Sequence, residues 1–525
     1  MLQLRPILFL LVARFGGVFS SIGPRASLPI VNKEIEPDGY RRISTLAGGT
    51  FPAPIIRVNK GDQLELNVIN QLNSTSLDLV TSIHWHGLFQ NHTNYVDGAA
   101  FVTQCPIVPK DTFQYRFAVP GQAGTFWYHS HFKNQYCDGL RGALIISDPQ
   151  DPHRHCYDVD DDSTVITLAD WYHYLSTNAP PMAAFTSSLI NGKGRYPGGP
   201  SDVPLAIVNV QKGKRYRFRL VSISCDPSFT FSIDGHQMTV IEVEGTNVQP
   251  LLIDSLEIFA GQRYSVVVTA NQPVSNYWIR SIGRSAIITT NFSDFNSLAV
   301  LHYAGAPHEN PTVDPTVNIP VSRMPLVEKN LHPLIPSPVP GNPVPGGADI
   351  NINLNVVVDP SIGAFHVNGA SFVPPSIPVL LQILSGTHKA SDLLPKGSIY
   401  GLELNKSVEL TIPGGAVGGP HPVHLHGHNF HVVRSAGNPT YNFDDPVIRD
   451  VVSMGNTGDD VTIRFMTDNP GPWFFHCHID WHLNAGFGVV FAEDVPDVPS
   501  QDITAPGWEK LCPSYEKFNK EQFGG

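Results

Sequence analysis

Four His-x-His segments constrain this chain more than any other feature of its sequence. In chain order they are His84-Trp85-His86, His129-Ser130-His131, His424-Leu425-His426 and His476-Cys477-His478. Residues two apart in an extended strand face the same side, so each segment presents two imidazoles together. Neutral imidazole is the commonest metal ligand in proteins. Eight imidazoles that converge on one place suit several metal ions, so we expect strands arranged around a metal cluster.

The same alternation separates a second set of ligands. Cys477 lies in the middle of its segment and therefore points away from the two flanking histidines. His421 is an odd number of residues from His424 and His426, so in an extended segment it also faces away from them. His482 lies just beyond the last segment. One thiolate with two imidazoles is the trigonal ligand set of blue copper. Zinc is the alternative metal, but structural zinc prefers paired cysteines and the chain has no Cys-x-x-Cys.

The rest of the chain favours an all-β fold built from antiparallel sandwiches. Short β-rich runs recur, for example at Gln63–Ile69, Arg215–Val221 and Tyr264–Thr269. The second of these alternates strictly between arginine and apolar residues, which is typical of a half-buried strand. The 45 glycines and 46 prolines of the whole chain supply many turns, and only 15% of the 525 residues are charged. Long runs of helical periodicity were not found, so sandwiches are the expected architecture.

An internal echo predicts how the chain divides into domains. His84-Trp-His-Gly is similar to His424-Leu-His-Gly, 340 residues later, and Gly124-Thr-Phe-Trp-Tyr-His-Ser-His is similar to Gly471-Pro-Trp-Phe-Phe-His-Cys-His, 347 residues later. The near-equal offsets indicate that the first and last domains are copies of one fold. The proline-rich stretch 306–347 is typical of a linker. We therefore expect domains at 21–150, 151–325 and 326–525.

The N-terminus and the charge indicate the compartment and the class of partner. Residues 1–20 contain Arg5, a short apolar run at 6–13 and the small-residue site Val18-Phe19-Ser20, which together predict a signal peptide; a buried first strand is the alternative. No other stretch is apolar enough to span a membrane, so we expect a secreted protein. The formal charge of −12 argues against nucleic-acid binding. N-glycosylation sequons occur at Asn73, Asn91, Asn291 and Asn405.

The histidine segments and their surroundings resemble the four copper-binding signatures of the laccase-type multicopper oxidases, most closely those of secreted fungal laccases. The matching text is HWHGLFQ followed by DGAAFVTQCPI, GTFWYHSHFKNQYCDGLRG, HPVHLHGHNF and GPWFFHCHIDWHLNAGF. KGKRYRFRLVSISCDP in the middle third also matches. The resemblance implies three cupredoxin-like Greek-key β-sandwich domains, with a three-copper cluster between the first and the last.

The resemblance also implies how the ligands are shared among four copper ions. Type 1 copper would take His421, Cys477 and His482, and type 2 copper His84 and His424. One type 3 copper would take His86, His129 and His478, and the other His131, His426 and His476.

Other residues match family positions beside these ligands. Phe487 stands at the axial position of type 1 copper; since phenylalanine cannot coordinate, we expect a high potential. Asp226 matches the carboxylate that contacts phenols, although an Asp-Pro turn is the structural alternative. Asp97 and Asp480 match acidic residues near the two copper centres. The resemblance implies that Asp97 relays protons to dioxygen and that Asp480 is a further catalytic residue, with support of the ligands as the alternative for Asp480.

The cysteine pairs implied by the resemblance are Cys105 with Cys512 and Cys137 with Cys225. Cys477 stays free as a ligand, and Cys156 is left over. The segments Pro180–Met182 and Ser281–Thr290 depart from the pocket-wall text of the family, which leaves substrate preference open.

The implied activity is the one-electron oxidation of phenols and aromatic amines, four per dioxygen reduced to water, by a monomer. Lignin degradation, pigment formation and detoxification would use the same residues. A metallo-oxidase acting on Fe(II) is one alternative; it would need more carboxylates beside His421 and His482. Ascorbate oxidase is a second, disfavoured by Phe487. A non-catalytic copper carrier is a third, but it would not need eight further histidines.

Overall fold

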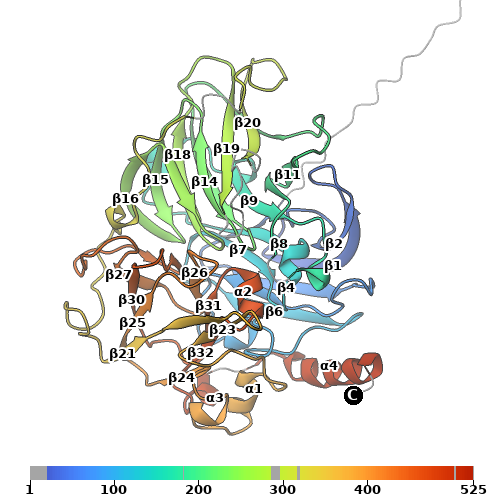
Figure 1. Ribbon diagram of the computed structural model, residues 1–525, viewed down its shortest axis with the longest axis vertical. Coiled ribbons are helices and arrows are strands. Elements are labelled where there is room, and N and C mark those ends of the chain that lie inside the picture. Colours follow the sequence, from blue (N-terminus) through green and yellow to red (C-terminus); the bar gives the residue numbers. More distant parts are fainter. Residues whose placement is uncertain (1–20, 181–182, 285–295, 316–319, 502–503, 524–525) are drawn as a thin grey trace, which may run out of the picture.

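The structure is a computed structural model that describes residues 21–180, 183–284, 296–315, 320–501 and 504–523. The predicted signal peptide, the sequon at Asn291 and parts of the two departing segments lie outside the described residues. Within the described part, the strands form seven sheets, six of which make three sandwiches that follow one another along the chain (Figure 1). The all-β fold of three cupredoxin-like domains is thus confirmed, whereas the exact limits at 150 and 325 stay a prediction.

The first sandwich pairs two four-stranded sheets, in the orders β2-β1-β4-β6 and β3-β8-β7-β5. In β4 every second residue is buried, as the alternation predicts, and Leu64 and Leu66 enter one core with Ile56 and Leu144 of the facing sheet. The strands are β1 (Arg25–Ile35), β2 (Arg42–Ala47), β3 (Ile56–Asn59), β4 (Gln63–Asn70), β5 (Ile83–His86), β6 (Thr112–Ala118), β7 (Gly124–Ser130) and β8 (Arg141–Ser147).

The second sandwich pairs a seven-stranded sheet, β11-β10-β9-β13-β18-β15-β16, with a five-stranded sheet, β12-β20-β19-β14-β17. Its strands are β9 (Val165–Trp171), β10 (Ser187–Ile190), β11 (Lys193–Gly194), β12 (Ala206–Val210), β13 (Arg215–Ser222), β14 (Ser228–Ile233), β15 (Met238–Val243), β16 (Thr246–Ile253), β17 (Ser255–Ile258), β18 (Arg263–Thr269), β19 (Asn276–Arg284) and β20 (Asn296–Tyr303). β13 holds the alternating run of the sequence, but two of its three arginines are not solvated: Arg217 and Arg219 are buried in ion pairs.

The third sandwich pairs the sheets β21-β25-β30-β27-β28 and β24-β32-β31-β26-β29, with a small β22-β23 hairpin beside them. Its strands are β21 (Ile350–Asn353), β22 (Val356–Asp359), β23 (Ala364–Val367), β24 (Ile399–Leu402), β25 (Ser407–Pro413), β26 (Pro422–Leu425), β27 (Phe430–Arg434), β28 (Ile448–Arg449), β29 (Val451–Ser453), β30 (Asp460–Met466), β31 (Gly471–Cys477) and β32 (Gly488–Glu493). The α-helices are α1 (Val379–Leu384), α2 (Asp480–Asn484), α3 (Val498–Gln501) and α4 (Trp508–Phe523).

The two copies of the His-x-His pattern occupy equivalent places in the first and third sandwiches. β5 pairs with β7 so that His84 lies opposite His129, and β26 pairs with β31 so that His424 lies opposite His476. Both pairs of strands are antiparallel, and β7, β26 and β31 come together at the middle of the molecule (Figure 1). The predicted metal site therefore lies where two sandwiches meet.

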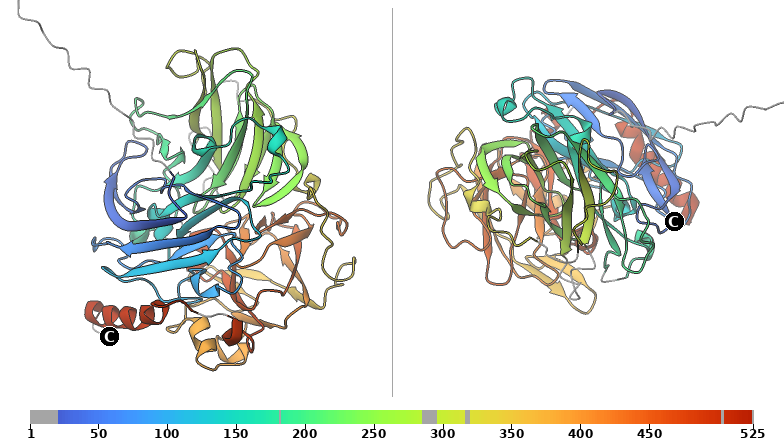
Figure 2. Two further views of the ribbon diagram at one scale, coloured as in Figure 1. Left: turned by 180° about the vertical axis from the view of Figure 1, so that it is seen from behind. Right: turned by 90° about the horizontal axis from the view of Figure 1, so that it is seen from above.

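Helix α4 was not anticipated from the sequence. It lies beneath the first sandwich (Figure 2) and is attached there by the Cys105–Cys512 disulfide. Its apolar residues Trp508, Leu511, Tyr515 and Phe518 recur at helical spacing and pack on first-domain residues. The periodic signal was present, but it is confined to 16 residues of otherwise polar sequence. No helix among the described residues is long and apolar enough to span a membrane.

Candidate metal centre

The eight histidines of the His-x-His segments converge in the interior. Each is at most 8% exposed, although they come from four strands of two sandwiches. Ring nitrogens approach one another closely: His426 Nε2 lies 3.0 Å from His476 Nε2, and His478 Nε2 lies 3.2 Å from His86 Nδ1. Donor atoms of neutral rings that gather this tightly around one space are arranged to share positive ions.

The outer nitrogen of several rings is fixed, which tests whether copper fits the site. His84, His129 and His424 each place Nδ1 within 2.9 Å of a backbone carbonyl oxygen, that of Asp97, Ser130 and Asp450 respectively. Because a carbonyl oxygen can only accept, each Nδ1 carries the proton and each Nε2 presents its lone pair. These three Nε2 atoms are buried and have no hydrogen-bond partner. Orphaned lone pairs with anchored outer nitrogens are the arrangement expected of metal ligands.

Two carboxylates complete the outer layer. Asp97 Oδ2 accepts from His426 Nδ1 at 2.8 Å, and Asp450 Oδ1 lies 3.1 Å from His86 Nε2. The second contact turns His86 so that Nδ1, rather than Nε2, faces the cluster. Sequence reasoning found Asp97 through the family text but missed Asp450. Asp450 lies 24 residues after His426, at no spacing that a local pattern would select.

Burial keeps seven of these histidines neutral, which is the state that binds a metal. Burial, followed by the repulsion of neighbouring rings, lowers the pKa of several of them well below the ordinary value of 6.5; these are His86, His129, His131, His424, His426 and His476. Burial likewise lowers the pKa of His478 to about 3. Because protonation at these buried positions is unfavourable, the ring nitrogens keep a lone pair that can bind a metal ion.

Two of the predicted ligand sets form tight groups, with all ligand atoms within 4.8 Å of one another: His131, His426 and His476, and His421, Cys477 and His482. Other groups of this kind combine His84 with His86 and His129, or with His424 and His426. The structure thus brings all eight cluster histidines together. How they divide between the type 2 ion and the other type 3 ion stays a prediction.

The predicted type 1 ligands lie apart from the cluster histidines, on the other side of β31. His421 Nδ1 is 3.1 Å from His482 Nδ1, and Cys477 Sγ is 3.6 Å and 3.8 Å from these two atoms. His421 directly precedes β26, and His482 stands in the short helix α2. Burial raises the pKa of the Cys477 thiol, so without a positive ion the sulfur stays protonated.

Phe487 lines this second site as an apolar wall. It is 2% exposed, its ring centroid lies 5.3 Å from that of His421, and it stacks on Phe365 at 5.2 Å. Its backbone oxygen accepts from Cys477 N at 3.1 Å. A side chain without donor atoms therefore occupies the position beside the thiol and imidazole ligands.

The exposed side of the second site is His482. Gly418 covers it closely: a Cβ on Gly418 would lie 3.1 Å from His482 Nε2, and φ of Gly418 is +93°. His482 itself is half-buried. The loop that carries Asp226 is tied to α2 through Asp480 N, which donates to Cys225 O at 2.9 Å. Asp226 is 6% exposed, and its amide donates to Asp170 Oδ2 at 3.1 Å.

Asp480 lies in a different environment from Asp97. Its Oδ2 is 3.6 Å from Cys137 Sγ, and burial raises the pKa of its carboxyl group. Cys137 forms a disulfide with Cys225, which joins the first and second sandwiches. The contacts of Asp480 are those of a residue that holds the Asp226 loop and α2 in place.

Cys156, the cysteine left over by the predicted pairing, is a free, partly exposed thiol whose sulfur lies 3.4 Å from His155 Nε2.

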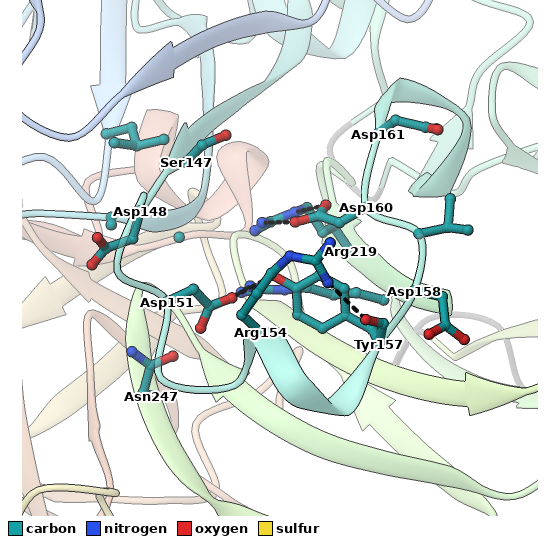
Figure 3. A pocket seen from close by; sticks show the side chains of 15 residues that line it. Ser147, Asp148, Asp151, Arg154, Tyr157, Asp158, Asp160, Asp161, Arg219 and Asn247 are labelled. Carbon is teal, nitrogen blue, oxygen red and sulfur yellow. Dashed lines mark hydrogen bonds and ion pairs between the residues drawn. The ribbon is translucent and has the colours of Figure 1, made fainter. Parts of the chain in front are cut away.

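A polar cavity of about 510 Å³ lies between the first and second sandwiches (Figure 3). Its two buried arginines are already paired, since Arg217 Nη1 lies 2.7 Å from Asp151 and Arg219 Nη2 lies 2.7 Å from Asp160. Arg154 donates to the Tyr157 carbonyl oxygen at 2.8 Å. None of the predicted ligands lines the cavity. Because Arg219 Nη1 also donates to Thr125 Oγ1 of the first sandwich at 2.9 Å, we interpret this region as a polar network that joins two domains.

Comparison with known proteins agrees with this geometry. Family models described as multicopper oxidase match residues 30–151, 162–306 and 372–497. Among solved structures, a laccase from Botrytis aclada matches with a TM-score of 0.80 and 31% identity, covering 95% of this chain and 93% of that one. Fet3p, titled a multicopper oxidase that functions in iron import, matches with a TM-score of 0.78 and 29% identity over 94% of this chain and 95% of its own.

Curated relatives are closer in sequence. A laccase of Phlebia radiata is 56% identical over 506 residues, which cover 95% of each chain. Laccase-2 of Trametes versicolor is 54% identical over 518 residues and 98% of each chain, and laccase-2 of Pleurotus ostreatus is 53% identical over 523 residues, 97% of this chain and 96% of its own. With the three matched domains and the two groups of ligands, these identities show that the chain belongs to the multicopper oxidases and, among them, to the fungal laccases.

Proposed function

We propose that this laccase holds four copper ions and oxidises phenols and aromatic amines with dioxygen as the electron acceptor. The ligand sets are His421, Cys477 and His482 for type 1; His84 and His424 for type 2; and His86, His129 and His478, with His131, His426 and His476, for the type 3 pair. The observation that carries the proposal is the convergence of eight buried imidazoles beside a separate Cys-His-His group. The bound copper would supply one-electron acceptance from substrate and four-electron reduction of dioxygen to water.

Cys477 connects the two groups of ligands covalently. One peptide step on either side leads to His476 and His478, whose rings belong to the cluster. His476 Nδ1 also donates to the Cys477 carbonyl oxygen at 2.8 Å, which fixes that ring relative to the strand. The buried strand β31 therefore provides a short through-bond path, closed to water, from the outer site to the inner one.

At the outer site, two groups meet the substrate in this proposal. His482 presents a partly exposed ring edge. Gly418 lies beside this edge and has no side chain that would block it. The Asp226 carboxylate accepts the phenolic proton as the phenol is oxidised, because a phenol becomes strongly acidic when it loses an electron. The Cys225–Asp480 hydrogen bond and the Cys137–Cys225 disulfide hold the loop of Asp226 against α2.

At the inner site, Asp97 has two tasks. Oδ2 accepts from His426 Nδ1 and so orients that ring. Oδ1 is buried and has no hydrogen-bond partner of regular geometry, although it lies 3.3 Å from His84 Nδ1. This oxygen is the place where a proton is held for delivery to reduced oxygen.

We further propose that the protein is secreted as a glycosylated monomer. The sequons at Asn73, Asn91 and Asn405 are all exposed, and both disulfides suit an oxidising compartment.

The proposal is tested by oxygen-electrode stoichiometry on copper-loaded protein with 2,6-dimethoxyphenol, with catalase added midway. We expect four phenols oxidised per dioxygen and no oxygen returned by catalase. Oxygen returned by catalase would mean that peroxide is released and would contradict the three-copper cluster. Uptake with Fe(II) but not with phenol would favour the metallo-oxidase alternative instead. A copper content near one per chain would contradict the whole scheme and indicate a carrier.

A further inference from the structure

A second cavity, of about 310 Å³, has no part in the copper chemistry described above. It lies where three segments meet: the loop after β5, the proline-rich linker, and the ends of β27 and β30 in the third sandwich. Asn91 and Phe89 border it from the first segment, Pro338 and Pro340 from the second, and His431 and Asn469 from the third. Asn91 is exposed, so it stands at the mouth of the cavity.

The polar wall of this cavity has unused hydrogen-bonding groups. His431 is 9% exposed, and neither of its ring nitrogens has a hydrogen-bond partner of regular geometry, although the backbone of Arg464 and Ser337 lies close enough to affect it. Asn469 Oδ1 and Asn429 Oδ1 are also buried and without partners. Buried polar groups are rarely left unsatisfied, so several orphaned atoms around one cavity indicate a ligand that supplies hydrogen bonds.

The character of these groups narrows the ligand class. Burial lowers the pKa of His431 to about 4, so at ordinary pH its ring is neutral, with one donor and one acceptor. The two amide oxygens only accept. Part of the lining is apolar, since Phe89, Phe465, Pro338 and Pro340 contribute rings but no polar side-chain atom. A ligand with hydroxyl groups on its edge and C–H groups on its faces satisfies both the polar and the apolar groups, and a pyranose sugar has this form.

We infer that the cavity holds the first N-acetylglucosamine of a glycan attached to Asn91, the acetamido and ring faces lying on the phenylalanines and prolines and the hydroxyls on His431 and Asn469. Asn91 begins the sequon Asn91-His92-Thr93 and borders the cavity, so the attached sugar starts at its mouth. The inference rests on the proposed passage through the secretory pathway and is independent of the copper assignment.

The test uses full-length protein secreted by a yeast that adds high-mannose glycans. Site occupancy is read from glycopeptides by mass spectrometry, and the folded protein is then treated with an endoglycosidase that cleaves between the first two sugars. We expect cleavage at Asn91 to be about tenfold slower than at Asn73 and Asn405, which corresponds to about 1.4 kcal/mol for releasing the sugar. After denaturation the three sites should be cleaved alike.

A variant pair links the protection to the cavity. His431→Leu removes the orphaned nitrogens, and we expect cleavage at Asn91 to accelerate towards the rate at Asn73. His308→Leu, at an exposed histidine outside the cavity, should leave the protection unchanged. If His431→Leu is not secreted, the stability of glycosylation variants decides: Asn91→Gln should lower the melting temperature by about 2–4 °C, whereas Asn73→Gln should not.

Three results would overturn the inference: an Asn91 that carries no glycan in the secreted protein, equal cleavage at all three sites in the folded state, or full protection that persists in His431→Leu. Occupancy of Asn73 and Asn405 is read in the same experiment. A bare Asn91 beside occupied neighbours contradicts this inference alone, whereas bare sites throughout also contradict the proposed secretion.

Discussion

At the scale of single residues, the side chains that touch no metal decide how the ligands are presented. The Asp97 carbonyl and carboxylate fix the rings of His84 and His426, and Asp450 turns His86 so that Nδ1 faces inward. Each contact selects a tautomer, because an accepting oxygen requires the proton on the nitrogen that faces it. The ligand list from the sequence thus names the rings, and these neighbours determine which nitrogen of each ring is offered.

Phe487 carries the first prediction. Phe487→Met places a thioether sulfur beside Cys477 and His421, where a weak axial ligand favours the oxidised ion. We expect the type 1 reduction potential to fall by on the order of tens of millivolts. Redox titration of the blue absorption band measures it. Phe491→Met, at a buried position in the strand β32 that follows Phe487, is the control and should leave the potential unchanged. An unchanged reduction potential in Phe487→Met would mean that this residue does not occupy the axial position.

At the scale of elements, the alternation of strands separates the two groups of proposed copper ligands. β31 turns His476 to one face and Cys477 to the other, and the pairing of His424 with His476 aligns β26 with it. This part of the site could be predicted from spacing alone, because a strand leaves no freedom in which side faces which way. Helix α4 could have been predicted in the same manner, since its apolar residues recur at helical spacing, but the stretch was too short and polar to stand out.

The loop before β18 carries the second prediction. Gly261 has φ of +84°, and a Cβ there would lie 2.9 Å from His478 Cδ2 and 3.1 Å from His86 Cε1. We expect Gly261→Ala to displace both rings and to lower copper binding at the cluster while the blue type 1 site remains. Copper analysis and visible spectra measure the two sites separately.

Gly213→Ala is the matched control for this prediction. Gly213 has nearly the same φ, +87°, but nothing lies within 4 Å of the added Cβ. In both variants an alanine must adopt a positive φ, which destabilises the fold by about 1 kcal/mol, so both should have a melting temperature a few degrees lower. Only Gly261→Ala should lose copper. Equal copper content in the two variants would show that the rings tolerate the side chain.

At the scale of the whole molecule, the second sandwich supports a cluster to which it contributes no predicted ligand. Arg263, at the start of β18, is fully buried and binds both carboxylate oxygens of Asp450, at 2.7 Å and 2.6 Å. Asp450 in turn contacts His86 of the first sandwich and, through its carbonyl oxygen, His424 of the third. One ion pair therefore holds residues of all three domains in register.

The third prediction tests this ion pair. Arg263→Met leaves Asp450 buried without its cation, and removing one partner of such a pair costs about 3–5 kcal/mol. We expect loss of type 3 copper, seen as loss of its near-ultraviolet absorption, while the blue band persists. Arg280→Met breaks a comparable buried pair with Asp234 inside the second sandwich. That control should lower stability similarly but keep all copper; copper loss in both variants would indicate a general folding defect.

The fourth prediction concerns acid stability. Burial by itself raises the pKa of Glu242, but Arg217 and Arg219, with hydrogen bonds from Ser265 and Thr125, overcome this and hold it at about 2, against an ordinary value of 4.5. A carboxyl group with a lowered folded pKa stabilises the fold fully above about pH 4.5 and loses this contribution as the pH falls towards 2. The contribution is about 3 kcal/mol.

We therefore expect the melting temperature of Glu242→Gln to be lower than that of the parent at pH 6 and the difference to shrink near pH 2.5. Calorimetry across this range measures it. Glu309→Gln, at an exposed glutamate, should follow the parent at every pH. Thr125 N of the first sandwich donates to this carboxylate at 2.8 Å. If the difference in melting temperature between Glu242→Gln and the parent stayed constant with pH, the charge of the carboxylate would not contribute to stability.

What the sequence determined by itself was which side chains share one face of a strand. The spacing of the histidines places His84 with His86 and sets Cys477 opposite its neighbours, because strand geometry leaves one answer. The resemblance to the family suggested roles for Asp97, Asp226 and Phe487, which stay predictions. What only the tertiary structure decided was the set of contacts between distant segments. Asp450 meets His86 across 364 residues and Arg263 across 187, and Gly261 makes room for both rings. No local pattern encodes such contacts, because they exist only once three separately folded sandwiches are packed together.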